Sequence, residues 1–139
     1  MTPEQIAHVQ NTFKMVLPIK ETAAKLFYDR LFALDPDLRS MFKGDMAEQG
    51  RKLMEVLATA VGNLEKLDEI LPIVQALGER HAGFGVKPEH YNTVGEALIW
   101  TLEQGLTDTF TTEVKEAWVA VYSALSSVMQ DAAADKAAA

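Results

Sequence analysis

Several polar side chains lie on helical faces that are otherwise apolar, where the loss of hydration needs a compensating partner. His81 follows Leu77 by one turn on such a face, directly before the glycine-interrupted corner AGFGVKP. The other polar side chains on apolar faces are Tyr28, Gln49, Tyr91 and Tyr122. An imidazole can ligate a metal, and a phenol or an amide can donate a hydrogen bond to a bound ligand. Each can equally be a hydrogen-bonded core residue.

The local sequence gives no support for a metal site made of several histidines, because positions 8, 81 and 90 have no helical turn in common. His8 and His90 are expected to face solvent. One imidazole with no other ligand nearby does not hold zinc, but it can be the axial ligand of an iron that four porphyrin nitrogens already hold. Such a site needs a large apolar slot and hydrogen-bond donors on the opposite face. His81 is therefore a candidate iron ligand beside its ordinary interpretation as a core histidine.

The composition argues against several other functions. The chain has no cysteine, which removes disulfides, cysteine-ligated zinc, iron–sulfur clusters and thiol catalysis. Its 13 basic and 20 acidic residues give a net charge of −7, so a nucleic acid is a poor candidate partner. No phosphate-binding loop, G-x-S-x-G elbow or H-E-x-x-H pair is present. With no signal-like start and no apolar run of ~20 residues, we expect a cytoplasmic protein without membrane insertion.

The spacing of the apolar residues predicts one all-α domain of about six or seven helices, with no strand. The helix openings and breaks are expected at Thr2, Pro18, Asp35, Pro72 and Pro88. The domain is expected to span residues 1–131. The alanine-rich tail, residues 132–139, is expected to be frayed or disordered.

Four segments, in this order and at this spacing, carry a resemblance to a known family. They are KLFYDRLFALDPDLRSMF, QGRKLMEVL, ERHAGFGVKPEHYNTVGEALIWTL and AWVAVYSALSSVM. Over roughly residues 1 to 130 the chain resembles the globins, and more closely single-domain bacterial haemoglobins and the globin domain of flavohaemoglobins. The resemblance implies a globin fold enclosing haem b (iron protoporphyrin IX).

The resemblance also assigns roles residue by residue. His81 matches the proximal ligand of the haem iron. The distal ligand-binding positions are Tyr28, Gln49 and Leu53, and the other haem-binding positions are Phe42, Leu77, Val86, Tyr91, Val94 and Lys52. Because a phenol and an amide can both donate hydrogen bonds to a bound ligand, the resemblance implies high oxygen affinity. Tyr28 is also a candidate sixth ligand of ferric iron.

On the proximal side, the backbone carbonyl of Leu77 is expected to accept a hydrogen bond from the ring of His81. In flavohaemoglobins a glutamate late in the last helix joins the proximal histidine and tyrosine. The corresponding residue is taken to be Asp135, which is shorter and lies in the tail, so the resemblance leaves this proximal network in doubt.

Three functional hypotheses follow from the residues and the resemblance. The first is a haem globin that binds oxygen for storage or delivery and also takes nitric oxide and carbon monoxide. The second is a nitric oxide dioxygenase for nitric oxide detoxification. It would depend on a separate reductase, because the chain ends before a flavin domain could fit. The third is a haem-free globin-fold signalling module, against which the joint presence of His81, Phe42, Tyr28 and Gln49 argues. No oligomeric state is predicted.

Overall fold

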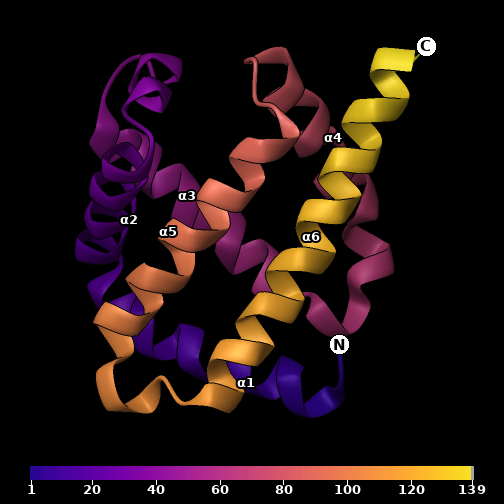
Figure 1. Ribbon diagram of the computed structural model, residues 1–139. Helices are drawn as coiled ribbons and strands as arrows, with labels where there is room; N and C mark the ends of the chain where they lie inside the picture. Colours follow the sequence, from indigo (N-terminus) through magenta and orange to yellow (C-terminus); the bar gives the residue numbers. More distant parts are fainter. Residues whose placement is uncertain (139) are drawn as a thin grey trace.

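A computed structural model describes residues 1–138 and contains only helices within that range, as the sequence predicts (Figure 1). Six are α-helices: α1 (Pro3–Val16), α2 (Lys20–Leu34), α3 (Met46–Gly62), α4 (Leu67–Gly83), α5 (Pro88–Leu106) and α6 (Thr112–Ala138). Four are short 3₁₀ helices: η1 (Leu17–Ile19), η2 (Pro36–Met41), η3 (Leu64–Lys66) and η4 (Thr107–Thr109). None of the helices in this range is long and apolar enough to cross a membrane.

The helix boundaries near the N-terminus follow local chemistry. Thr2 and Gln5 form a reciprocal capping box, in which each side chain accepts a hydrogen bond from the other's backbone N–H. Pro18 interrupts the helical pattern and lies in η1, which turns the chain from α1 into α2. The carboxylate of Asp35 accepts from the N–H of Asp37 and opens η2. These expected starts and breaks are confirmed.

The main core lies where α1, α2, α5 and α6 meet. Its most fully buried large side chains are Val9, Leu31, Trp118 and Val121. The indole N–H of Trp118 donates to the hydroxyl of Thr12 over 2.9 Å, and that hydroxyl donates to the carbonyl of His8. The buried polar atoms of this core are thereby hydrogen-bonded, which avoids the cost of leaving them without partners.

Two glycines bring helices close enough to place the candidate residues. A Cβ on Gly50 of α3 would lie 2.9 Å from the Cβ of Ala24, so α3 and α2 cross with almost no side chain between them. A Cβ on Gly78 of α4 would lie 2.3 Å from the carbonyl oxygen of Met129 in α6. These contacts fix α3 beside α2, and they fix α4 beside α6 (Figure 1).

Two expected boundaries differ from the structure. Pro72 does not open a helix, because α4 begins at Leu67 and Pro72 lies inside it. A proline there removes only one intrahelical hydrogen bond, and the buried side chains of Ile70 and Val74 on either side anchor the helix through it. At the other end, the expected domain boundary at residue 131 falls inside α6, which runs to Ala138; alanine, common in this segment, has the highest helix propensity. Residue 139 lies outside the described residues.

Candidate functional site

His81 lies in the last turn of α4, half-buried, with its ring held by the backbone of its own helix. Its Nδ1 is 2.8 Å from the carbonyl oxygen of Leu77, the contact that the sequence predicts. A carbonyl only accepts, so Nδ1 must carry the proton and donate it. In the neutral imidazole Nε2 then has a free lone pair, and it has no hydrogen-bond partner within residues 1–138. His81 therefore offers one nitrogen, Nε2, as a possible metal ligand, and the hydrogen bond of Nδ1 fixes the tautomer and the orientation of the ring.

The corner after His81 folds back onto the end of α4. The N–H groups of Phe84 and Val86 both donate to the carbonyl of His81, and Gly85 adopts a φ of +88°, which glycine tolerates without strain. The half-buried side chain of Val86 is thereby kept beside the end of α4. The corner therefore fixes the backbone of His81 and returns the chain toward α5.

His90 has a structural role at the start of α5 that the sequence did not predict. Its side chain is half-buried, and Nδ1 accepts a hydrogen bond from the backbone N–H of Lys87 over 2.9 Å. That N–H lies at the start of α5, where the helix itself offers no acceptor. His90 thus caps α5 while its side chain stays partly exposed.

Tyr91 lies in the first turn of α5 and faces the same region as His81. The two ring centroids are 6.5 Å apart, and only 7% of Tyr91 is exposed. Its hydroxyl is buried and has no hydrogen-bond partner among the described residues. Burial also raises the pKa of this phenol. Asp135 is exposed on α6 and makes no hydrogen bond to Tyr91 or His81, so it does not complete a proximal network.

The predicted residues form two groups, which we call walls: one on the end of α4, the corner after it and α5, the other on α2, the segment after it and α3. Tyr28 of α2 is the most buried polar residue of the second wall, with 9% of its surface exposed. Its ring packs edge-on against Phe42, with centroids 5.3 Å apart. Its hydroxyl donates to the backbone carbonyl of Gln49 over 3.4 Å, which is long for an O–H donor. Burial raises the pKa of Tyr28 to about 12, so the phenol is a neutral donor at physiological pH.

The remaining predicted residues lie on the same two walls with different exposures. Gln49 in the first turn of α3 is half-buried, and Gly50 beside it keeps this turn against Ala24 of α2. Lys52 is exposed on α3, as suits a cation that meets a polar group at a surface. The apolar members, all partly buried, are Phe42, Leu53, Leu77, Val86 and Val94.

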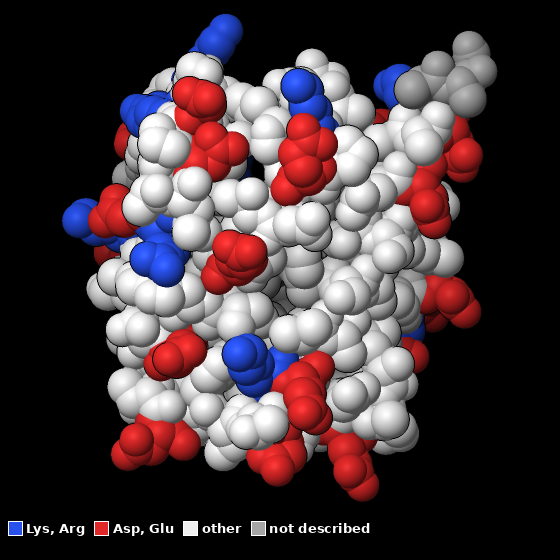
Figure 2. Space-filling model, viewed as in Figure 1, with Lys and Arg blue, Asp and Glu red and all other residues white. Residues whose placement is uncertain are grey.

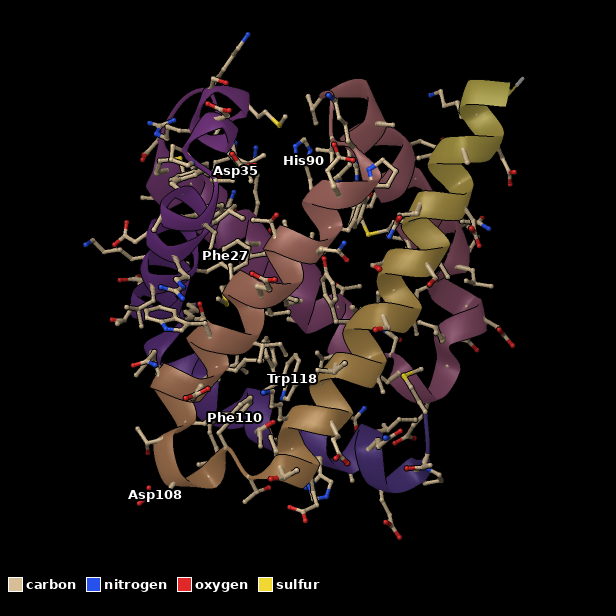
Figure 3. The ribbon with its side chains drawn as sticks, in the orientation of Figure 1. Phe27, Asp35, His90, Asp108, Phe110 and Trp118 are labelled. Atoms are coloured by element: carbon tan, nitrogen blue, oxygen red, sulfur yellow. The ribbon has the colours of Figure 1, made fainter. Side chains whose placement is uncertain are left out.

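The segment that follows α2 and the corner between α4 and α5 lie at the same end of the molecule (Figure 1). Asp35, which opens η2, and His90, which caps α5, are labelled at that end on either side of the space between the walls (Figure 3). In the space-filling view the surface is hollowed there, between charged side chains on its rim (Figure 2). The structure thus gathers Tyr28, Phe42 and Gln49 on one side. On the other side it gathers His81, Val86 and Tyr91.

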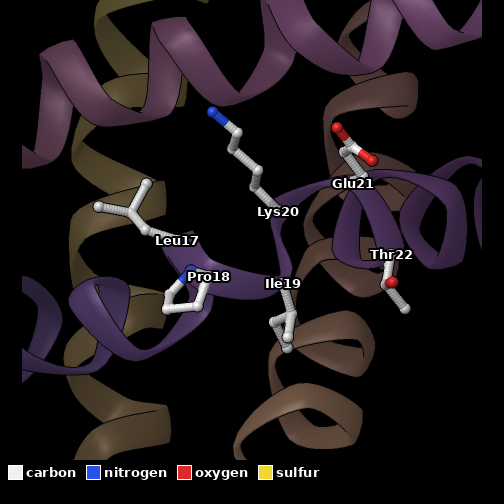
Figure 4. Close-up of a pocket in the computed structure, with 6 residues that line it drawn as sticks. All are labelled: Leu17, Pro18, Ile19, Lys20, Glu21 and Thr22. Atoms are coloured by element: carbon white, nitrogen blue, oxygen red, sulfur yellow. The ribbon is translucent and has the colours of Figure 1, made fainter.

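Two hollows elsewhere involve none of the predicted residues. One is formed by the turn around η1, residues 17–22 (Figure 4). The other lies between α1 and α3, where Phe13 and Val61 form part of its floor. No histidine lines either of these two hollows.

The donor groups of the site fit haem. Within residues 1–138 no group of three or more His, Asp or Glu side chains could hold a bare metal ion. A single neutral imidazole with a free Nε2 instead suits an iron that brings its own equatorial ligands. Partly buried apolar side chains on both walls suit a flat apolar ring system.

Some contributors to the site were not predicted. Phe32 stacks on Tyr28 with centroids 6.0 Å apart, and it also contacts Phe42 edge-on. Phe32 is four residues after Tyr28, which places both on one helical face, so their spacing carried a usable signal. Gly50 and Gly95 allow close contacts with Ala24 and Tyr122. The sequence indicated them only weakly, as single glycines inside helical patterns.

Comparisons with known proteins identify the family of the chain. A family model described as Globin matches residues 25–129. The flavohemoprotein of Vibrio cholerae is 33% identical over 128 residues, which are 87% of this chain and 32% of that protein. The flavohemoprotein of Bacillus subtilis is 30% identical over 123 residues, 85% of this chain and 30% of that protein. The chain therefore spans about a third of the length of these relatives.

Two solved structures are similar over nearly the whole chain. A bacterial globin from Campylobacter jejuni gives a TM-score of 0.87 at 24% identity, covering 99% of this chain and 100% of that one. An engineered carbene transferase, made from a protein named as a nitric oxide dioxygenase of Rhodothermus marinus, gives 0.90 at 20% identity. That match covers 99% of this chain and 96% of the other. At these identities the likeness concerns the fold, and it confirms the expected fold class.

Proposed function

This chain belongs to the globin family, and on that premise we propose that it binds haem b through His81 and takes up oxygen reversibly for storage or delivery. When bound, haem would supply an iron that can take a diatomic ligand. The observation that carries the proposal is the hydrogen bond of 2.8 Å between Nδ1 of His81 and the carbonyl of Leu77, which leaves Nε2 as the available nitrogen.

Different residues of the two walls have different roles in the proposed binding of haem. His81 supplies the proximal nitrogen, and the apolar side chains of Phe42, Leu53 and Val94 exclude water from the haem faces. Leu77 and Val86 bound the proximal side, and Tyr91 lies beside the histidine ring. Lys52 is placed to meet a haem propionate at the surface. Each of these roles is part of the proposal.

On the distal side Tyr28 and Gln49 set the affinity for oxygen. The phenol of Tyr28 is protonated at physiological pH and can donate to a ligand that carries partial negative charge. Its present acceptor, the Gln49 carbonyl, is 3.4 Å away and is easily exchanged for a better one. The amide of Gln49 offers a second donor. We expect high oxygen affinity with slow release.

Nitric oxide dioxygenation with electrons from a separate reductase is the alternative function. The relatives named flavohemoprotein favour it, because they combine a haem protein with a flavin protein and this chain matches about a third of their length. The same donors, Tyr28 and Gln49, would serve either activity. Carbon monoxide and nitric oxide are further expected ligands. The cytoplasmic location expected from the sequence stays a prediction.

Haem binding is tested by the absorption spectrum of purified protein reconstituted with haemin. We expect a Soret band that is lost or strongly shifted in His81→Ala and retained in His90→Ala, since His90 only caps α5. A protein that stays colourless with added haemin would contradict the proposal and favour a haem-free module.

The two functions are separated by mixing the oxygenated protein with nitric oxide in a stopped-flow instrument and then adding cell extract. Rapid nitrate formation followed by rapid re-reduction would identify a dioxygenase. Slow re-reduction would identify a carrier, because turnover then lacks a supply of electrons.

A further inference from the structure

The negative charge of the molecule is concentrated in its last two long helices. Residues 88–135 carry eight acidic side chains and one basic one, Lys115, and their charge of −7 equals the net charge of the whole chain. The other acidic and basic residues cancel. α5 and α6 hold most of this segment and lie in the foreground of Figure 1. The same view of the surface shows more acidic than basic side chains over them (Figure 2).

The outward side of α5 carries carboxylates and no cation. Glu89, Glu96 and Glu103 are exposed and follow one another at intervals of seven residues, which places them on one side of an α-helix. The sequence of α5 contains no lysine or arginine. None of the three carboxylates forms an ion pair with a basic side chain of residues 1–138. Their charge is therefore available to attract a cationic surface.

Trp100 lies on the same side of α5, one turn after Glu96. It is partly exposed, whereas Trp118, the second tryptophan of the chain, is only 2% exposed and belongs to the core. The guanidinium carbon of Arg30 in α2 lies 5.1 Å from the centroid of the Trp100 ring, a cation–π contact that positions both side chains. Tryptophan and arginine are among the residues that most often dominate the binding energy of protein interfaces.

Arg30 is held in place by Trp100 and not by a counter-ion. Its side chain is partly buried, and it forms no ion pair with an acidic residue in the described part of the chain. Its Nε is buried and has no hydrogen-bond partner there. A guanidinium has five N–H donors, so its terminal N–H groups remain for an acceptor on another molecule. Four residues thus form one surface, which we call the Trp100 face: Arg30, Glu96, Trp100 and Glu103.

We propose that the Trp100 face is a docking surface for a partner protein whose contact face is basic. Cationic side chains opposite the two carboxylates would steer the encounter, and the Trp100 ring with Arg30 forms the centre of the contact. A second copy of this chain does not fit, because a two-fold interface sets the same surface against itself and would bring like charges together. The docking role does not depend on the proposed ligation by His81.

The test uses the haem-loaded protein with lysozyme, a basic protein, as the probe. We expect lysozyme at low ionic strength to shift the NMR signal of the Trp100 indole N–H and to leave that of Trp118 in place, since Trp118 is buried. The affinity should fall as salt is added. Binding that leaves the Trp100 signal unchanged would overturn the proposal, and so would a complete absence of binding.

Two double variants separate the Trp100 face from the net charge. Glu96→Gln with Glu103→Gln removes two charges from this face, and Glu65→Gln with Glu69→Gln removes two exposed charges from η3 and the start of α4. We expect the first pair to weaken binding about fivefold, as the loss of two exposed ion pairs predicts, and the second pair to change it much less. Equal weakening would mean that net charge alone attracts the probe, which would contradict a docking surface.

A second copy is tested with the protein alone. We expect the Trp100 signal to be independent of protein concentration in NMR and sedimentation experiments run in parallel. A dimer whose formation shifts that signal would assign the Trp100 face to self-association and overturn the proposal. The Soret band of each variant checks that the haem site is intact. A protein that takes up no haem would overturn the role of His81 and leave the docking test in place, so the two failures are distinguishable.

Discussion

Tyr28 shows how burial and a weak hydrogen bond together prepare a side chain to meet a ligand. Desolvation holds its pKa near 12, which keeps the phenol protonated, and its donor bond to the Gln49 carbonyl is long at 3.4 Å. Its ring is confined by Phe27, Phe32 and Phe42, so the hydroxyl keeps its place when its acceptor changes. The donor is thus positioned before any ligand arrives.

Replacing Tyr28 by phenylalanine tests this role. The variant keeps the aromatic contacts and loses one donor, whose hydrogen bond to the ligand is worth about 1–1.5 kcal/mol. We expect oxygen dissociation to accelerate roughly tenfold, as 1.4 kcal/mol corresponds to a factor of ten. The measurement is the oxygen off-rate of the haem-loaded protein. Gln49→Ala should have a smaller effect, and an unchanged off-rate in Tyr28→Phe would rule out the role of the phenol.

Of the local contacts around His81 and His90, the sequence predicted one and missed another. The bond from His81 to the Leu77 carbonyl follows from helical periodicity, because a carbonyl four residues earlier is always within reach. The cap formed by His90 was missed, since its acceptor role depends on which ring nitrogen meets the N–H of Lys87. The separation of Asp135 from Tyr91 depends on how α6 is rotated, which no local pattern specifies.

The helices are placed by close crossings that only small residues permit. Gly78 is the tightest case, because an added Cβ would lie 2.3 Å from the carbonyl oxygen and 2.6 Å from the Cα of Met129. The obstacle is backbone rather than a flexible side chain, so α4 and α6 would have to move apart. Since His81 lies one turn after Gly78, the same crossing determines where α4 presents its histidine.

Substituting Gly78 by alanine should therefore destabilise the protein in spite of the higher helix propensity of alanine. We expect the free energy of unfolding to fall by about 1–3 kcal/mol, the usual cost of overpacking. Urea denaturation followed by circular dichroism measures it. Gly83→Ala in the same helix is the control, because its Cβ meets no atom within 4 Å and should be neutral or slightly stabilising. Equal stabilities for the two variants would contradict the account of the crossing.

At the scale of helices, hydrophobic periodicity predicted which helices the chain forms but not where each one begins and ends. The openings at Thr2 and Asp35 were predicted because capping is local chemistry. Pro72 misplaced the start of α4, since tertiary packing of Ile70 and Val74 overrides the local preference of proline for a first turn. The globin arrangement itself came from the family resemblance, because many packings of six helices satisfy the same stripes.

Over the whole molecule, burial affects the ionisation of every tyrosine of the chain. The sequence has three tyrosines, at positions 28, 91 and 122, and burial raises the pKa of each above the ordinary value of 10.0. In the unfolded chain all three would ionise near that value. The folded state therefore retains protons that the unfolded state releases at alkaline pH.

The stability of the protein should consequently fall as the pH rises above 10. Below pH 10 the phenols are neutral in both the folded and the unfolded state, so their full contribution to the free energy of unfolding is present. Above pH 10 the phenols of the unfolded state ionise first, which lowers the free energy of unfolding until the pH reaches the pKa values of the folded state. For Tyr28, with a native pKa of about 12, the loss amounts to roughly 3 kcal/mol. Urea unfolding at a series of alkaline pH values measures the free energy of unfolding, and tyrosinate absorbance recorded in parallel measures the ionisation of the tyrosines.

Tyr28→Phe is the control, and it should lose less stability over this pH range than the unmodified protein. Tyrosines that titrate near pH 10 in a fully folded protein would contradict the prediction.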